Sequence, residues 1–247
     1  MAGRLWVGTS GWVYRHWMGL FYPERIRGEE LLPFYARHFQ TVEINYTYYR
    51  LPERSVFEGW RSRVPDGFRF AVKASRYLTH LRRLQEPEEP LTRLLERAGG
   101  LGEKLGPVLF QLPPNWEADP GRLEAFLAAL QRWPGHRFAF EFRHPSWLTP
   151  GVYGALERAG AALCLPVHPE MPLERRLTAG WTYVRFHAGS RGMGFGEEEL
   201  APWARRIGEW RRGGAEVWCY FNNDMGGHAL RDARTLLRLC GADGSFG

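Results

Sequence analysis

The sequence has few cysteines, almost no lysine and no long apolar run, and each shortage excludes a class of protein. Its three cysteines, Cys164, Cys219 and Cys240, stand far apart and form no CxxC pair, so neither a disulfide framework nor a zinc site is indicated. No apolar stretch approaches the ~18 residues that a membrane helix needs, and no membrane partner is expected. A strand-like run begins at Leu5, so we expect no secretory leader. Together these features predict a reduced, cytoplasmic protein.

Lysine is scarce although the chain is basic. The net charge is +6, yet only Lys73 and Lys104 among the 33 basic residues are lysines. Such a skew fits a compositional bias or a nucleic-acid-binding face. No dense basic run occurs, which favours the bias. Binding to single-stranded nucleic acid stays open as an alternative.

Length and composition fit one globular domain over residues 1–247. The length is close to the ~250 residues of a single β/α barrel, and 44% hydrophobic with 24% charged residues is an ordinary globular composition. We find no linker and no low-complexity segment. Eight strand-like segments are predicted: Leu5–Thr9, Thr41–Asn45, Phe68–Lys73, Pro107–Leu112, Phe138–Arg143, Ala161–Val167, Thr182–His187 and Glu216–Asn222.

Helical patterns alternate with these strands, as in a parallel sheet built by crossovers. They cover Glu29–Phe39, Arg54–Arg63, Leu91–Ala98, Arg122–Gln131, Val152–Ala159, Glu197–Arg211 and Ala229–Leu239. The sixth connection is an exception, since Pro166, Pro169 and Pro172 break it. The prediction is a single parallel (β/α)8 TIM-like barrel with an irregular sixth β/α unit. A doubly wound open sheet is the alternative.

The strands alternate between apolar and polar side chains. From Phe138 to Arg143, three phenylalanines face one side while Ala139, Glu141 and Arg143 face the other. The other strands repeat this pattern, with the polar members late in each strand. In a parallel barrel the apolar face meets helices, and the carboxyl-terminal rim of the interior carries the chemistry.

The sequence also resembles a known protein family. The motifs are Gly8–Trp12, Thr41–Asn45, Tyr49–Pro52, Phe70–Lys73, Gln111–Pro114, Glu141–His144, Arg185–His187 and Tyr220–Asp224. In this order they resemble the YecE-like family, domain of unknown function 72. The resemblance implies a TIM-barrel-like fold and a distant likeness to sugar isomerases, but no established reaction. The chain departs from the family at Gly189–Gly196, where Gly-Met-Gly-Phe-Gly stands in place of a tyrosine-containing loop.

Closure of the barrel would bring the late polar side chains together. The candidate catalytic residues are Lys73, Glu141 and His187. The candidate substrate-binding residues are Glu43, Asn45, Trp12, Tyr49, Gln111, Arg143, Arg185, Tyr220, Asn222 and Asn223. A satisfied salt-bridge network is the alternative for any one of these polar groups, but a buried ionic network is a poor way to stabilise a core.

Individual roles follow from side-chain chemistry. A desolvated lysine can lose its proton where arginine cannot, so Lys73 is expected to act as base, acid or Schiff-base amine. Glu141 is the expected partner, because two carboxylates in one interior, Glu43 and Glu141, would push each other's pKa apart. Arg185 would clamp an anionic or polyol substrate, and His187 would shuttle a proton.

Other features leave alternatives open. No cofactor is predicted, although Glu43, Glu141, His187 and Asp224 could together hold a divalent metal. Rim aromatics such as Trp12 and Tyr49 could stack on a sugar or base, or simply plug the barrel mouth. The Gly189–Gly196 loop is interpreted as a flexible lid, with a phosphate cradle as the alternative.

The sequence therefore favours an enzyme that performs acid–base chemistry on a small hydroxylated or anionic molecule, in the manner of a sugar isomerase. A single-stranded nucleic-acid-binding protein is one alternative. A metabolite-binding regulator without turnover is the other.

Overall fold

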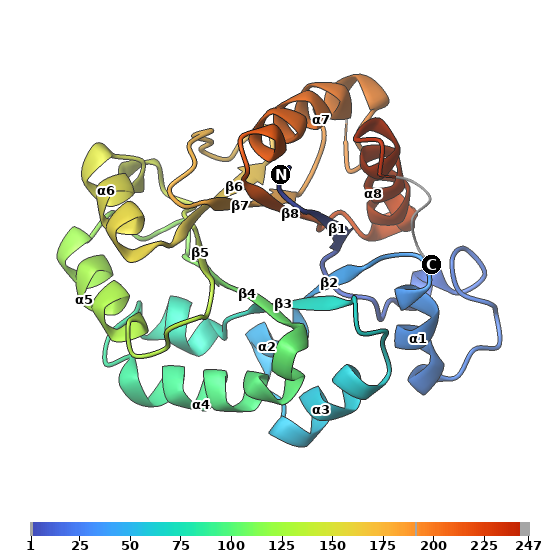
Figure 1. The fold of residues 1–247 in the computed structure, drawn as a ribbon, viewed down its shortest axis with the longest axis horizontal. Coiled ribbons are helices and arrows are strands. Elements are labelled where there is room, and N and C mark those ends of the chain that lie inside the picture. The colour runs from blue at the N-terminus through green and yellow to red at the C-terminus, as the bar shows by residue number, and fades with distance from the viewer. Residues whose placement is uncertain (1, 191, 243–247) are drawn as a thin grey trace.

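Eight parallel strands form a nearly closed barrel with helices outside it (Figure 1). The computed structural model describes residues 2–190 and 192–242, so residues 1 and 243–247 of the predicted 1–247 domain and residue 191 of the 189–196 loop lie outside the described residues. The strands are β1 (Leu5–Thr9), β2 (Thr41–Ile44), β3 (Arg69–Lys73), β4 (Leu105–Gln111), β5 (Phe138–Glu141), β6 (Ala162–Val167), β7 (Trp181–Phe186) and β8 (Glu216–Phe221). The sheet order is β1-β8-β7-β6-β5-β4-β3-β2. The predicted barrel is confirmed, and the open doubly wound sheet is wrong.

Each predicted helix is present with shifted ends. The helices are α1 (Leu31–Ala36), α2 (Tyr46–Tyr49), α3 (Arg54–Ser62), α4 (Glu88–Ala98), α5 (Pro120–Leu130), α6 (Pro150–Ala159), α7 (Glu197–Arg212) and α8 (His228–Leu239). Helices α5 and α6 begin earlier than predicted, because proline is favourable in the first turn and the Asp119 and Thr149 side chains cap them. The short helix α2 was not predicted.

Several strands end one or two residues before the predicted position. Strand β2 stops at Ile44 because Asn45 already has helical backbone angles and begins α2. Strand β5 likewise stops at Glu141, and Arg143 lies beyond it. Asn45 and Arg143 therefore sit on turns that leave the strands, whereas Lys73 and Gln111 are the last residues of β3 and β4.

The irregular sixth unit is confirmed. No helix occurs between β6 and β7, and the fully described segment 168–180 crosses as a loop. Thr178 ties this loop to β6, since its hydroxyl accepts from the backbone N–H of Leu163 at 2.8 Å and donates to the carbonyl of Ala161 at 2.7 Å. The loop is thus anchored without a helix.

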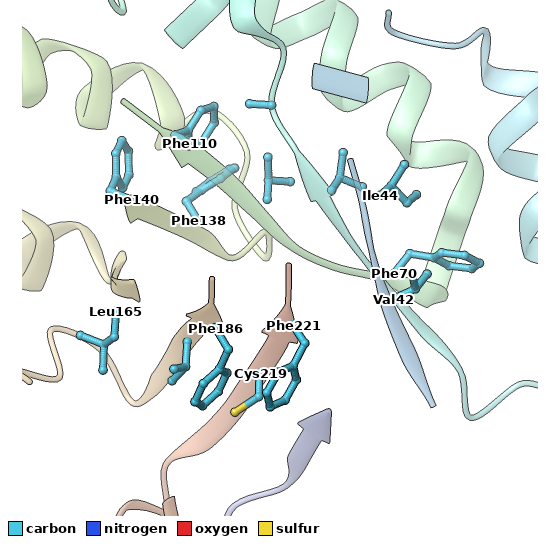
Figure 2. Close-up of a cluster of buried hydrophobic side chains, with 14 of the residues drawn as sticks. Val42, Ile44, Phe70, Phe110, Phe138, Phe140, Leu165, Phe186, Cys219 and Phe221 are labelled. Carbon is cyan, nitrogen blue, oxygen red and sulfur yellow. The ribbon is translucent and has the colours of Figure 1, made fainter. Parts of the chain in front are cut away.

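Two layers of apolar side chains hold the barrel. The outer layer joins the strands to the helices, and Figure 2 shows members of it from β2 to β8, such as Phe70, Phe140 and Phe221. The inner layer fills the barrel near the amino-terminal ends of the strands, where the indoles of Trp6 and Trp218 stack with centroids 4.8 Å apart. Polar residues occupy the interior above this layer, as the alternation predicts.

One hydroxyl group joins the seam between β1 and β2, in addition to the backbone hydrogen bond from the Gly11 N–H to the Glu43 carbonyl at 2.8 Å. The Tyr35 hydroxyl accepts from the backbone N–H of Thr9 at 2.9 Å and donates to the carbonyl of Thr41 at 3.1 Å. The strands also approach closely at Gly8, where a Cβ atom would lie 2.1 Å from the Thr41 carbonyl oxygen. Glycine at this position and the tyrosine bridge allow the barrel to close.

Two further observations concern the chain as a whole. Within the described residues, no helix is both long enough and apolar enough to cross a membrane. The three cysteines are free thiols.

Candidate functional site

The polar centre of the barrel is built around Arg185. Its guanidinium donates from Nε and Nη2 to the two carboxylate oxygens of Glu43, at 3.0 and 2.8 Å. Nη1 donates to Oε2 of Glu141 at 2.8 Å. All three residues are almost completely buried. The structure thus brings together side chains from β2, β5 and β7, as the strand alternation predicts.

Each carboxylate has further partners. Glu43 accepts from the hydroxyl of Tyr183 at 2.7 Å and from that of Ser10. Glu141 accepts from Arg143, and the thiol of Cys164 lies 3.7 Å from its Oε2. Arg143 therefore points inward, although it lies beyond the end of β5. Satisfied in this way, both carboxylates are fixed in position.

The charges of these groups set the pKa of each carboxyl. Burial raises the pKa of Glu43, but the neighbouring charges of Arg185 and Lys73 outweigh burial and hold that pKa below its usual value. At Glu141 burial is outweighed by Arg185 and Arg143, and its pKa lies well below normal. The prediction that the two carboxylates push their pKa values apart is therefore wrong. Arg185 lies between them and stabilises both as anions.

Lys73 stands apart from this network. It ends β3, is only 7% exposed, and holds its Nζ atom 4.2 Å from the centre of the Tyr48 ring. Among the described residues its ammonium group makes no ion pair. Burial and the charge of Arg185 lower the pKa of Lys73 from 10.5 to about 8, and the two carboxylates only partly offset this effect. A simple ion pair to a glutamate does not describe this lysine.

His187 lies beside the network with a neutral ring. Burial lowers its pKa from 6.5 to about 4, although Glu141 opposes the shift. Its Nε2 atom lies 3.3 Å from Nη2 of Arg143 and 3.6 Å from Oε1 of Glu141. Its Nδ1 atom lies 3.2 Å from Nδ2 of Asn222. The ring is therefore held between the Glu141–Arg143 pair and the end of β8.

Gln111 extends this group of residues. It ends β4 directly opposite Glu141 in the strand register and is half-buried. Its side chain makes no hydrogen bond to any described residue. Together, Lys73, Gln111, Arg143, His187 and Asn222 form a partly exposed rim above the buried Arg185, and we call these five residues the rim set.

Two predicted residues lie outside this rim. The Tyr220 hydroxyl is buried inside the barrel and pairs with the Thr41 hydroxyl at 2.7 Å. The Asn223 side chain donates to the Met193 carbonyl at 2.6 Å and to Asp232 at 2.7 Å. Tyr220 thus belongs to the interior, and Asn223 ties β8 to the outer layer.

Three more predicted residues line a separate cleft. Trp12, Asn45 and Tyr49 border a depression of about 510 Å³ between the loop after β1 and helices α1, α2 and α3. No residue of the rim set lines it. The structure therefore divides the predicted substrate-binding residues among the rim, the buried interior and this cleft, with Asn223 outside all three.

One of the four possible metal ligands has a different partner. The Asp224 carboxylate lies 3.4 Å from Nε2 of His16, whereas Glu43, Glu141 and His187 belong to the polar centre. No group of three or more His, Cys, Asp or Glu side chains in residues 2–190 and 192–242 has the arrangement of a metal site.

Comparison with known proteins agrees with this architecture. The family model described as "Protein of unknown function DUF72" matches residues 6–245. The chain belongs to the DUF72 family.

Relatives within DUF72 span nearly the whole chain. The protein YecE of Escherichia coli K12 is 28% identical over 234 residues, covering 84% of this chain and 82% of YecE. YunF of Bacillus subtilis is 25% identical, with 95% and 94% of the two chains covered. A crystal structure of a DUF72 protein from Thermotoga maritima superposes with a TM-score of 0.78 at 26% identity, covering 96% of this chain and 99% of that one.

The sequence reasoning missed three groups that contact the carboxylates. Ser10 and Tyr183 bind Glu43, and Cys164 approaches Glu141. Tyr183 shares the inward face of β7 with Arg185, so its position was available from the alternation. Ser10 comes from a loop, and no local pattern indicates which strand its hydroxyl faces.

Proposed function

We propose that this DUF72 protein performs acid–base chemistry on a small hydroxylated or anionic molecule at the carboxyl-terminal rim of its barrel. Lys73 transfers the proton, while Arg143, Gln111 and Asn222 bind the substrate's oxygen atoms. The single observation that carries this proposal is the state of Lys73. It is a buried amine that forms no ion pair with a carboxylate of the described residues, and its pKa is lowered to about 8.

The charge balance of the centre supports this role. The two carboxylates of Glu43 and Glu141 face three cationic side chains, those of Arg185, Arg143 and Lys73. Loss of the Lys73 proton balances the local charge, and an anionic substrate or intermediate does the same. A general base is most effective when its pKa lies near the working pH.

Glu141 has a different role from the one expected. Its charge is fixed by two guanidinium groups, so we assign it to positioning Arg143 and His187 rather than to moving protons. The neutral His187 ring, oriented by Asn222, hydrogen-bonds a substrate oxygen and passes a proton between its two nitrogens. Glu43 in turn positions Arg185.

The test measures proton abstraction directly. The protein is incubated in D₂O with a panel of aldoses, ketoses and 2-hydroxy acids, each with and without a phosphate group, and loss of C–H signals is followed by proton NMR. At least one compound should exchange. The exchange rate should rise with pH, reach half of its maximum near pH 8 and level off above that value, as the Lys73 amine becomes neutral.

Matched lysine variants separate the proposal from general damage. Lys73→Met should abolish exchange while the thermal unfolding transition remains cooperative. Lys104→Met is the control, because Lys104 is also buried but donates to the Arg61 and Val64 carbonyls away from the rim. Exchange that persists in Lys73→Met would refute the assignment. Reduction with borohydride in the presence of a reactive carbonyl compound would show whether Lys73 forms an imine.

The two other functions remain predictions. Binding of oligonucleotides with a steep salt dependence would favour the nucleic-acid alternative. Saturable binding of a metabolite without exchange or product would favour a regulatory protein.

A further inference from the structure

The cleft beside α2 has the character of a ligand site in its own right. Its walls are mainly aromatic and come from the loop after β1 and from helices α2 and α3. They include Trp12, Tyr46, Tyr49 and Trp60. Small-molecule sites are typically concave, mostly apolar and supplied with a few polar groups. The volume of about 510 Å³ suits a molecule of one or two rings.

One part of the cleft wall is held in place by packing, and another part is exposed to solvent. Trp12 packs edge-on against Trp60 with ring centroids 5.3 Å apart, and its carbonyl accepts from Tyr22 at 2.6 Å. Tyr46 and Tyr49, by contrast, are 54% and 71% exposed at the edge of the cleft. Large apolar side chains gathered at one exposed concave place mark interaction sites.

One polar atom at the cleft has no partner among the residues that the structure describes. The Oδ1 atom of Asn45 has almost no exposed surface and accepts no hydrogen bond from them. An unsatisfied buried acceptor costs about 1–3 kcal/mol. A ligand that brings an N–H or O–H donor would remove this cost.

Among the described residues that line the cleft, one side chain is charged, that of Arg63 at the end of α3. Arg63 forms no ion pair with any described residue. An unpaired guanidinium beside an aromatic wall is complementary to a negative charge on a planar molecule.

We propose that this cleft binds a planar ring that bears a hydrogen-bond donor and an anionic substituent, the chemistry shared by nucleotides and aromatic acids. The ring lies against Tyr46 and Tyr49, its donor faces Asn45, and its anionic group pairs with Arg63. The inference does not depend on the acid–base function, because the cleft and the rim set share no residue.

Binding is tested by isothermal titration calorimetry on the whole protein. Adenosine 5′-monophosphate and indole-3-acetate carry ring, donor and charge together. Adenine and indole lack the charge, and ribose 5-phosphate and acetate lack the ring. We expect saturable binding of one or both complete molecules, and weaker binding of every fragment. The preferred complete molecule distinguishes a nucleotide site from a site for aromatic acids.

Paired variants locate the site. Tyr49→Ala should weaken binding about tenfold, the loss expected for one stacked aromatic ring, while Tyr77→Ala, an exposed tyrosine outside the cleft, leaves it unchanged. Arg63→Gln should remove the advantage of the anionic molecules over adenine and indole, and Arg132→Gln should not. Lys73→Met should bind normally, so failure of the acid–base proposal would not affect this result.

Three outcomes would overturn the proposal. The first is the absence of saturable binding by every complete molecule. The second is binding that Tyr49→Ala and Arg63→Gln leave intact. The third is a concentration-dependent dimer lost in Tyr49→Ala, which would identify the cleft as a contact between copies of the chain.

Discussion

Arg185 binds both carboxylate oxygens of Glu43 through two parallel hydrogen bonds, from Nε at 3.0 Å and from Nη2 at 2.8 Å. Strands β2 and β7 are not neighbours in the sheet, so this pair spans the barrel interior. Because Arg185 also holds Glu141, one guanidinium fixes the carboxylates of two strands. Bidentate pairing gives both energy and a defined geometry.

Arg185→Met should therefore be severely destabilising. The change leaves two buried carboxylates without their main partner, which costs about 3–5 kcal/mol. Urea denaturation at neutral pH measures this loss. Arg137→Met is the control, since Arg137 pairs with Glu216 at the surface, and its loss should cost under about 1 kcal/mol. Equal losses in the two variants would contradict a central role for Arg185. Adding Glu43→Gln and Glu141→Gln to Arg185→Met should recover part of the stability.

The hydroxyl of Tyr35 is predicted to hold the barrel seam. Tyr35→Phe removes the acceptor for the Thr9 N–H and the donor to the Thr41 carbonyl. Leaving buried backbone groups unpaired should lower the free energy of unfolding by about 1–3 kcal/mol. Tyr153→Phe is the comparison, because the Tyr153 hydroxyl makes no hydrogen bond to a described residue. Hydrogen exchange of the β1 and β2 amides should also speed up, and unchanged exchange there would argue against the bridge.

Lys73 should make stability depend on pH in the alkaline range. Its pKa is about 8 in the folded state and 10.5 in the unfolded chain, so between these values the unfolded state binds more protons and stability rises with pH. Between pH 8 and about 9.5, below the range in which tyrosines of the unfolded chain ionise, the gain is up to about 2 kcal/mol. Burial raises the pKa of the three cysteine thiols, so ionisation of these thiols in the unfolded chain opposes this rise. The Lys73 contribution is therefore measured by denaturant titrations as the stability of the wild type minus that of Lys73→Met at each pH. A rise of the same size in Lys73→Met would be the contradictory result.

His187 should act in the same direction at acid pH. Its pKa falls from 6.5 to about 4 on folding, so the unfolded state binds more protons between these values and stability decreases as the pH falls through them. His80, lowered to about 4 mainly by burial, adds a smaller effect because it is half-exposed. In His187→Gln the free energy of unfolding should therefore fall less steeply between pH 6.5 and 4 than in the wild type. An unchanged slope would mean that the ring is protonated in the folded state.

Sequence reasoning reached much of the fold because the relevant signals are local. The alternation from Phe138 to Arg143 identifies the inward side chains of β5, and the same rule holds for Lys73 and Arg185 on their strands. Element boundaries were less accurate, because proline in the first turn extends α5 and α6, and Asn45 leaves its strand early to begin α2. Local periodicity does not contain that information.

The amino-acid pattern was enough to predict the order of strands and helices, the apolar outer layer, and the polar groups that face the interior. The pairing of those groups became visible only in the folded protein. Glu43 and Glu141 both pair with Arg185, Lys73 forms no ion pair with a described carboxylate, and Trp12, Asn45 and Tyr49 line a separate cleft. The physical reason is that the face of a strand depends on backbone geometry alone. The choice of ion-pair partner depends instead on which residues from distant parts of the chain come close together, and they do so only when the barrel closes.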